Sequence, residues 1–283
     1  MLKYLKEQDF DRYVGFAYEL ALDMTKSGYP TYADGIKTKD DFIAQARRAF
    51  SRDNEWILLF EHHGRTAGWI HYYHLPEDRY LQTCSFCIAE GMREAITEFT
   101  AFVRRRFPGS ELYLGFPKEN AEACAALDAR GFERVEESYN DIMDFDQYIL
   151  RPEDPAIVPI TQDNFPLFSS LHAQHGQDMY WNSERILEAI DRWRIFVYLQ
   201  KGEPIGAIYL WADAAIAEIF GVDFSNDVYD GAVYRALLTA ALNNGKRSGM
   251  KHMVFFNDER SQLDALSRGF RCVGGYVCFK ARL

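Results

Sequence analysis

The sequence repeats one order of turns and apolar runs at a fixed spacing. Gly64-Arg65-Thr66-Ala67-Gly68 lies between two apolar runs, and Gly202-Glu203-Pro204-Ile205-Gly206 lies between two more, 138 positions later. The same spacing separates Arg130-Gly131-Phe132 from Arg268-Gly269-Phe270. A match of turn residues at one period is typical of a duplicated unit. Because the period is much longer than that of a solenoid repeat, each copy is predicted to fold as a domain.

Composition agrees with two globular domains. A length of 283 residues corresponds to two domains, at the usual ~100–200 residues each. Hydrophobic residues make up 48% of the chain, which is enough for two buried cores and argues against disorder. The net charge is −10. The densest basic cluster, Arg104-Arg105-Arg106, lies near the C-terminal end of a predicted helix, where positive charges interact favourably with the helix dipole. We therefore expect no nucleic-acid partner, and a weak preference for a cationic one.

Three further features bear on location. Residues 1–7 lack the apolar segment of a signal peptide. No run approaches the ~18 apolar residues of a membrane span, and an odd number of cysteines, five, fits reduced thiols. The sequence thus predicts a cytoplasmic protein with no membrane partner.

Both halves are predicted to contain the same order of elements. Two helices precede a strand hairpin and a third strand; a long helix, a strand, a short helix and further strand-like segments follow. The long helices are expected at about 92–107 and 232–247. Between the halves, Arg151-Pro152-Glu153-Asp154-Pro155 is a polar linker bracketed by prolines.

This pattern resembles the GNAT superfamily of acyl-CoA-dependent N-acyltransferases, in tandem form. The Gly-x-x-x-Gly hairpin is one shared feature, and the passage from Glu218 through a loop to a long helix is another. A third is an Asn followed eleven or twelve residues later by Gly-Phe, as at Asn120 and Asn257. The resemblance covers nearly all of both halves. It implies two α+β domains, residues 1–147 and 156–283, each a mixed, mostly antiparallel sheet with helices on both faces.

The resemblance also implies a cosubstrate, acetyl-CoA, and an acceptor, an amine of a small molecule or peptide. In these folds a loop entering a helix N-terminus holds the pyrophosphate of coenzyme A, because unpaired N–H groups and the helix dipole attract anions. The pantetheine arm pairs with the exposed edge of a bulged fourth strand. In the second copy, the arm would lie along Phe220, Gly221 and Val222. The pyrophosphate would lie near Gly231, Ala232, Val233, Tyr234 and Arg235.

The two copies differ in how well they match the family. The loop of the first copy, Ile88 to Arg93, runs almost directly from strand to helix and keeps one glycine. The second copy keeps the full loop length. Compared with the family's phosphate-binding loop, however, Gly231 is one position out of place and Tyr234 stands where the family has a small residue. The second copy is therefore predicted to hold the cofactor, and the first to be degenerate. Asn257 is either a cofactor contact or a helix N-cap.

Catalytic groups are fewer than the family pattern provides. Its general acid is commonly a Tyr four residues before the Gly of Gly-Phe, where this chain has Leu127 and Ala265. A candidate base, Glu218, is present only in the second copy; Cys84 or Ser85 lies near the equivalent place in the first. Glu218 could accept a proton through a water molecule, or be an ordinary solvent-facing strand residue. The missing acid leaves a second interpretation open, a catalytically inactive binding or scaffold protein.

Two groups of residues suggest metal binding, and neither completes a site. Cys84 and Cys87 are three apart on a predicted strand, so their side chains should point to opposite faces. His172 and His175 share a helix face, but two ligands do not make a zinc site. We therefore predict no metal. Met179-Tyr180-Trp181 lies where these folds line the acceptor pocket, and its aromatic rings either hold an apolar or cationic acceptor or fill the core.

Overall fold

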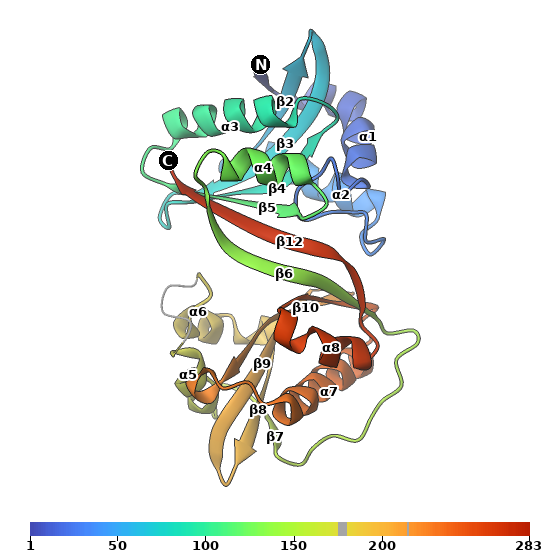
Figure 1. Ribbon diagram of the computed structural model, residues 1–283, viewed down its shortest axis with the longest axis vertical. Helices are drawn as coiled ribbons and strands as arrows, with labels where there is room; N and C mark the ends of the chain where they lie inside the picture. The colour runs from blue at the N-terminus through green and yellow to red at the C-terminus, as the bar shows by residue number, and fades with distance from the viewer. Residues whose placement is uncertain (175–179, 214) are drawn as a thin grey trace. The chain divides into compact units, whose positions relative to one another are not determined.

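The chain folds into two units whose limits do not follow the two halves of the sequence. The computed structural model describes residues 1–174, 180–213 and 215–283. Its first unit comprises Met1–Ser138 and Gly274–Leu283, and its second comprises Tyr139–Val273 (Figure 1). The sequence-derived boundaries, 1–147 and 156–283, divide the chain at the linker instead. The two divisions differ because the last strand of each half completes the sheet of the other unit.

This exchange involves two long strands. β6 (Glu133–Asp144) ends the first half, but its second part pairs antiparallel with β11 (His252–Asn257). β12 (Arg271–Arg282) ends the second half and pairs antiparallel with β5 (Glu111–Pro117). Each is one strand of 12 residues rather than the separate strand-like segments expected from the sequence.

The sheet of the first unit has the strand order β1-β2-β3-β4-β5-β12. Its other strands are β1 (Leu2–Tyr4), β2 (Glu55–His62), β3 (Arg65–Leu75) and β4 (Tyr80–Ile88). Its helices are η1 (Glu7–Asp9), α1 (Phe10–Ala21), α2 (Lys39–Arg47), η2 (Arg48–Phe50), α3 (Met92–Arg106) and α4 (Ala121–Asp128).

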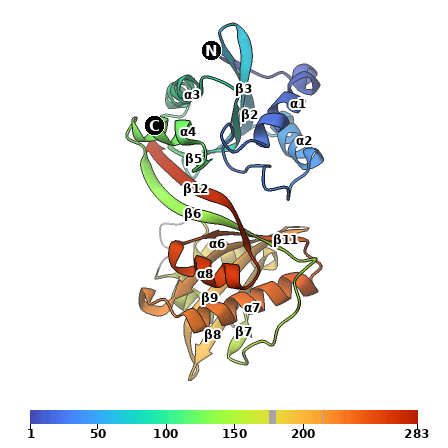
Figure 2. The ribbon, with the colours of Figure 1, turned by 45° about the vertical axis from the view of Figure 1, so that its right-hand side comes forward.

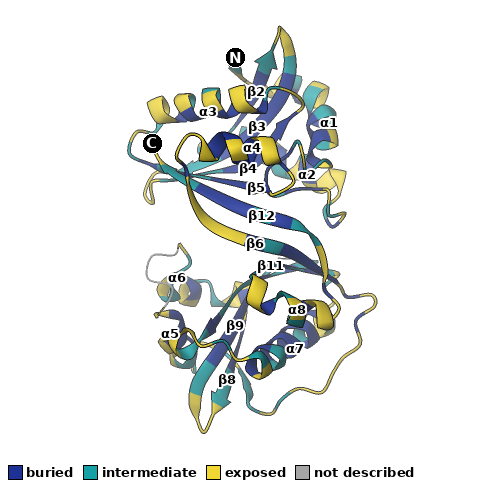
Figure 3. Ribbon diagram, viewed as in Figure 1, coloured by how far each residue is buried: buried dark blue, intermediate teal, exposed yellow. Residues whose placement is uncertain are grey.

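Helices cover both faces of this sheet because side chains alternate along each strand. On β2, Leu58 and Phe60 pack with α3 and α4 in one core. Ile57 and Leu59 pack with α1 and α2 in another. The outward faces of α3 and α4 are exposed and the strands beneath them are buried, as Figure 3 shows.

The sheet of the second unit has the order β6-β11-β10-β9-β8-β7. Its other strands are β7 (Ile157–Pro159), β8 (Trp193–Gln200), β9 (Glu203–Asp213) and β10 (Ile216–Phe224). Its helices are α5 (Pro166–His172), α6 (Ser183–Glu188), η3 (Ile190–Arg192), η4 (Ser225–Asp227), α7 (Gly231–Arg247) and α8 (Glu259–Ser267). Figure 2 shows α7 and α8 against this sheet.

The second unit repeats the layering of the first. Ile195 and Val197 of β8 pack with α5 and α6, whereas Phe196 between them packs with α7 and α8. In both units one strand pair is parallel, β4 with β5 and β10 with β11. The other pairs cited above are antiparallel. The expected α+β class, with mixed, mostly antiparallel sheets and helices on both faces, is confirmed.

The long helices predicted at 92–107 and 232–247 are α3 and α7, within one residue at each end. Among the helices of the described residues, none combines the length and apolar character needed to cross a membrane.

Candidate functional site

A β-bulge marks the same point in each unit. Cys84 is the extra residue of β4 against β3, and Phe220 is the extra residue of β10 against β9. Counting back from the bulge, Gln82 and Glu218 are equivalent, and each lies in the short parallel pairing with the next strand. The sequence-based match of Glu218 to Cys84 or Ser85 is therefore wrong by two or three positions. The bulge shifts the register, which the spacing of residues alone does not reveal.

Beyond the bulge the fourth strand of each unit leaves its parallel neighbour. β10 pairs with β11 only from Ile216 to Ile219, and β4 pairs with β5 only from Tyr80 to Gln82. A strand that leaves its partner has backbone N–H and C=O groups that must be paired in another way. What occupies this gap distinguishes the two units.

In the first unit the chain fills the gap with its own backbone. The segment after α1 runs along β4: Gly28 N donates to Phe86 O at 2.8 Å, and Ile88 N donates to Lys26 O at 2.8 Å. On the other side, Tyr29 N donates to Gly115 O of β5 at 2.9 Å. Residues Thr83 to Ile88 are all buried as a result.

Two side-chain features hold this inserted segment, residues 26–29. Asn120 Nδ2 donates to Ser27 O at 3.2 Å, while its Oδ1 caps α4 by accepting from Ala123 N. Gly28 fits where a Cβ would lie 3.0 Å from Gly115 O and 3.2 Å from Phe86 Cβ, so a larger residue would push the strands apart. The first unit therefore has no accessible edge at its bulge. Neither feature was recognisable from the sequence, because the segment has no strand-like pattern.

In the second unit the described residues leave the corresponding edge accessible. Phe220, Gly221 and Val222 are each partly exposed, unlike the buried residues of β4. Among the described residues, none forms a backbone hydrogen bond to them on the side that faces β11. An extended ligand can add to such an edge as a strand would.

The N-terminus of α7 lies at the end of the loop that follows β10. Its Ala232 and Val233 N–H groups donate to Asp230 Oδ1 at 2.8 and 3.1 Å. These two N–H groups are the donors expected to bind a pyrophosphate. In this structure the carboxylate of Asp230 already accepts both hydrogen bonds. The side chains of Val233 and Tyr234 are buried in the core and can contact no ligand there. The Gly231 N–H group, at the first residue of α7, is not one of the two donors to Asp230.

Cationic groups lie beside the first turns of α7. A cavity of about 360 Å³ is lined by Ala232, Arg235, Thr239 and Arg268, with Glu153 and Asp154 also on its wall. Arg235 Nη1 is 3.0 Å from Asp264 Oδ1. The pKa of Arg268 is lowered, first by burial and then by the nearby charges of Arg151 and Arg235. Its Nε atom is buried and has no hydrogen-bond partner among the described residues. Clustered arginines with an orphan donor favour an anion.

Comparisons with known proteins identify the arrangement of these elements. No protein-family model matches the sequence, and no curated protein matches it either. A GCN5-related N-acetyltransferase from Sphaerobacter thermophilus superposes with a TM-score of 0.67 at 13% identity, covering 99% of this chain and 95% of its own. The chain has the GNAT fold.

Two further solved structures agree with this assignment. A tandem GNAT protein from the clavulanic acid biosynthesis pathway superposes with a TM-score of 0.55 at 14% identity, over 99% of this chain and 98% of the other. A GCN5-related N-acetyltransferase from Kribbella flavida gives 0.53 at 11% identity, over 84% and 93%. The predicted resemblance to tandem GNAT proteins is thus confirmed for the fold.

Within the GNAT fold, Glu218 lies next to an aromatic cluster. It is partly exposed on β10, opposite Trp211 of β9 and Val254 of β11. The Trp211 ring lies 5.3 Å from that of Trp193 and 5.2 Å from that of Trp181, between centroids. Trp181 therefore packs against the core of the second unit, which was one of the two alternatives expected from the sequence. Met179 and His175 lie outside the described residues.

Asn257 does not cap the helix that follows it. It is the last residue of β11, and Asp258 caps α8 by accepting from Ser261 N. Asn257 is buried, donates from Nδ2 to Asp141 Oδ2 at 3.2 Å, and accepts from Ser261 Oγ. The N-cap alternative is wrong because the strand extends one residue further than the helix signal suggests.

A buried histidine supports the second unit's bulge and was not foreseen. His172 Nδ1 is 2.9 Å from Asp223 Oδ2, and His172 Nε2 is 3.0 Å from Trp181 O. Burial lowers the pKa of His172, but hydrogen bonds to Asp223 and Trp181 outweigh this effect and raise it above 6.5. Both ring nitrogens face acceptors, so the imidazolium form can donate to both. Asp223 follows Val222 directly, so this pair fixes the strand just beyond the bulge.

We expect the His172–Asp223 pair to make stability fall as pH rises above the ordinary histidine pKa of 6.5. A raised pKa stabilises the folded state below the ordinary histidine value and loses that contribution as pH rises through the folded pKa. His71 has a pKa lowered by burial, so it acts on the acid side instead. Urea unfolding at several pH values should show this slope, and His172→Gln should flatten it. Equal slopes for both proteins would contradict the assignment.

Proposed function

We propose that the second unit transfers an acyl group, acetyl, from acetyl-CoA to an amine of a small molecule or peptide. The partly exposed edge of β10 beyond its bulge is the observation that supports this most strongly, because the equivalent edge of the first unit is filled by residues 26–29. We therefore expect one acyl-CoA site per chain. In the reaction the amine nitrogen bonds to the thioester carbon, the carbon–sulfur bond breaks, and the sulfur leaves as a thiol. The coenzyme supplies the activated acyl group.

Each part of the cofactor has a candidate partner in the second unit. Phe220, Gly221 and Val222 present their backbone to the pantetheine arm. The start of α7, from Gly231 through Ala232 and Val233 to Tyr234 and Arg235, lies toward the phosphates, with Arg268 as an additional cation. Asn257 ends the strand on the opposite side of the gap, and its amide orients that end through Asp141. The residues therefore suit the arm well, whereas Asp230 competes with the phosphates.

Glu218 is the proposed base. The acceptor must lose a proton to attack, and a carboxylate two positions before the bulge can take it directly or through a water molecule. Trp211, which lies opposite Glu218 on β9, belongs to an apolar aromatic cluster. An apolar neighbour raises the pKa of a carboxyl group toward the range useful for a base. Leu127 and Ala265 stand at the two positions where the family commonly has its tyrosine acid, and both are fully buried and cannot donate a proton. The leaving sulfur would take its proton from solvent.

An inactive acyl-CoA-binding or scaffold protein is the alternative. Asp230 on the α7 N-terminus and the apolar residues at both acid positions favour it. Both interpretations predict a protein without nucleic-acid or membrane partners, and the proposed cytoplasmic location rests on the cysteine count. Binding and turnover experiments separate them.

Arg268→Ala should weaken acetyl-CoA binding about tenfold or more, because a charge-assisted contact to a phosphate is lost. Calorimetric titration of the wild type should give one site per chain. The matched control is Arg130→Ala, the same position in the first copy, where Arg130 bonds to Ala126 O and should not affect binding. If the two variants weaken binding equally, the cofactor site is not in the second unit. If the wild type does not bind at millimolar acetyl-CoA, the transferase proposal fails.

Asp230→Asn should strengthen acetyl-CoA binding by roughly threefold to tenfold. The amide oxygen can still cap α7, while removal of one negative charge beside the phosphates lowers electrostatic repulsion. Asp41→Asn, which removes a charge from the α2 capping box of the first unit, is the control and should leave affinity unchanged. Unchanged or weaker binding by Asp230→Asn would show that the phosphates lie elsewhere.

Glu218→Gln should lower kcat about 10²–10⁴-fold while leaving the Kd for acetyl-CoA unchanged, as expected for loss of a general base. The assay is release of free coenzyme A thiol with a panel of amines. Gln82→Glu places a carboxylate at the equivalent position of the first unit and should change neither value. A Glu218→Gln protein with wild-type kcat would assign the base to another group. Absence of turnover by the wild type with any amine, despite binding, would favour the inactive alternative.

A further inference from the structure

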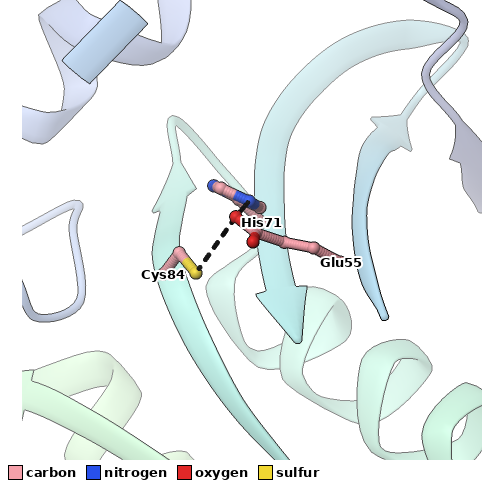
Figure 4. A group of neighbouring side chains, drawn as sticks. All are labelled: Glu55, His71 and Cys84. Atoms are coloured by element: carbon pink, nitrogen blue, oxygen red, sulfur yellow. Dashed lines mark hydrogen bonds and ion pairs between the residues drawn. The ribbon is translucent and has the colours of Figure 1, made fainter. Parts of the chain in front are cut away.

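Three side chains of the types that bind transition metals meet in the first unit. Glu55 begins β2, His71 lies on β3, and Cys84 is the bulge residue of β4 (Figure 4). Glu55 Oε1 is 2.7 Å from His71 Nε2 and 3.9 Å from Cys84 Sγ. The three ligand atoms lie within 4.8 Å of one another. All three residues are buried, with at most 5% of any of them exposed.

The fold does not require polar residues at these positions. By the register of the two bulges, Glu55, His71 and Cys84 correspond to Trp193, Tyr209 and Phe220 of the second unit. Those three pack as aromatic rings, with Trp193 5.4 Å from Phe220 and 6.0 Å from Tyr209. An apolar set therefore satisfies the same site of the same fold. Buried polar groups are retained only where they are paired or bind something.

In contrast to the metal-free protein expected from the sequence, we propose that the first unit binds one divalent transition-metal ion, Zn²⁺ in preference, through Glu55 Oε1, His71 Nε2 and Cys84 Sγ. Water or another small ligand completes the coordination. Zinc takes N, O and S ligands at about 2.0–2.3 Å, so tetrahedral bonding places the ligand atoms about 3.3–3.6 Å apart. The Glu55–His71 distance must open by about 0.6 Å and the Glu55–Cys84 distance must close by about 0.3 Å. His71 Nε2 and Cys84 Sγ lie within 4.8 Å of each other and must reach the same spacing, so metal binding requires all three side chains to rotate.

The protonation of the trio is compatible with this role. Burial lowers the pKa of His71, which keeps the imidazole neutral. Burial raises the pKa of Glu55, but His71, Arg48 and Arg52 outweigh this effect and keep the carboxylate ionised. On metal binding, the imidazole proton moves from Nε2 to Nδ1, and the thiol of Cys84 loses its proton to solvent. That thiol has its pKa raised to about 12 by burial, and the cation would offset this effect.

Two arginines compete with a cation for Glu55. Arg48 Nη2 lies 3.3 Å from Oε1, and Arg52 Nη1 lies 3.2 Å from Oε2. Both arginine side chains are substantially exposed, and both distances are long for charged hydrogen bonds. Arg52 can stay on Oε2, while Arg48 must turn toward solvent when the metal takes Oε1. Arg48 is therefore expected to weaken the site rather than form part of it.

The test is titration of the purified, metal-free full chain with Co²⁺, followed by competition with Zn²⁺. A thiolate ligand should give a near-ultraviolet charge-transfer band that saturates at one ion per chain and disappears when Zn²⁺ is added. Cys84→Ser should abolish the band. Cys87→Ser, a change at an equally buried thiol on the same strand, should retain it. Arg48→Ala should increase the affinity severalfold.

Thermal unfolding with and without Zn²⁺ gives a second readout that does not depend on the spectrum. The ion should raise the Tm of the wild type and of Cys87→Ser, but not that of Cys84→Ser or His71→Gln. Circular dichroism of the metal-free variants checks that they are folded. Absence of a charge-transfer band in the wild type, or binding that survives Cys84→Ser, overturns the proposal and leaves the trio as a buried ion pair. The outcome is independent of acetyl-CoA binding, which is assigned to the other unit.

Discussion

The divergence of two parallel strands after a bulge leaves each unit with backbone groups that need a new partner. Where β4 leaves β5 and where β10 leaves β11, backbone groups lose their ladder partners, and such groups must be paired with something. In the first unit residues 26–29 supply the pairing, through bonds to Phe86, Ile88 and Gly115. In the second unit the described residues leave the edge of Phe220 to Val222 accessible. At the same backbone geometry, the chain therefore closes the gap in one copy, whereas in the other copy the described residues leave it open.

The exchange of β6 and β12 explains why the units are not consecutive in the sequence. β5 obtains its antiparallel partner from the end of the chain, and β11 obtains its partner from the middle. Neither unit can complete its sheet without a strand from the other half, so truncation at the linker would remove the strand that pairs with β5 or with β11. We expect the two halves to fold cooperatively, because an edge of β5 or β11 without its partner strand leaves a row of hydrogen bonds unmade.

The sequence predicts what depends on local patterns and misses what depends on register and distant pairing. Helix periodicity and the turn residues that follow located the long helices α3 and α7 within one residue at each end. The equivalence of Glu218 with Gln82 could not be found, since a one-residue bulge changes the register without leaving a sequence signal. The contact between His172 and Asp223 could not be found either, because it joins elements far apart in the chain. The contact of Asp230 depends on the conformation of a single helix cap. The sequence therefore predicts the fold in more detail than the site.

Three equivalent positions show how the copies have specialised. An aromatic set around the second bulge makes an apolar wall beside an accessible edge, which suits an organic acceptor. A carboxylate, an imidazole and a thiol at the same positions of the first unit form a buried polar centre beneath a closed edge. An ion reaches such a centre more readily than an extended cofactor, because it needs three side-chain atoms and no free strand. Closure of the first gap by residues 26–29 and the polar substitution beneath it are consistent with the two proposals made above, an extended cofactor in the second unit and a small ion in the first.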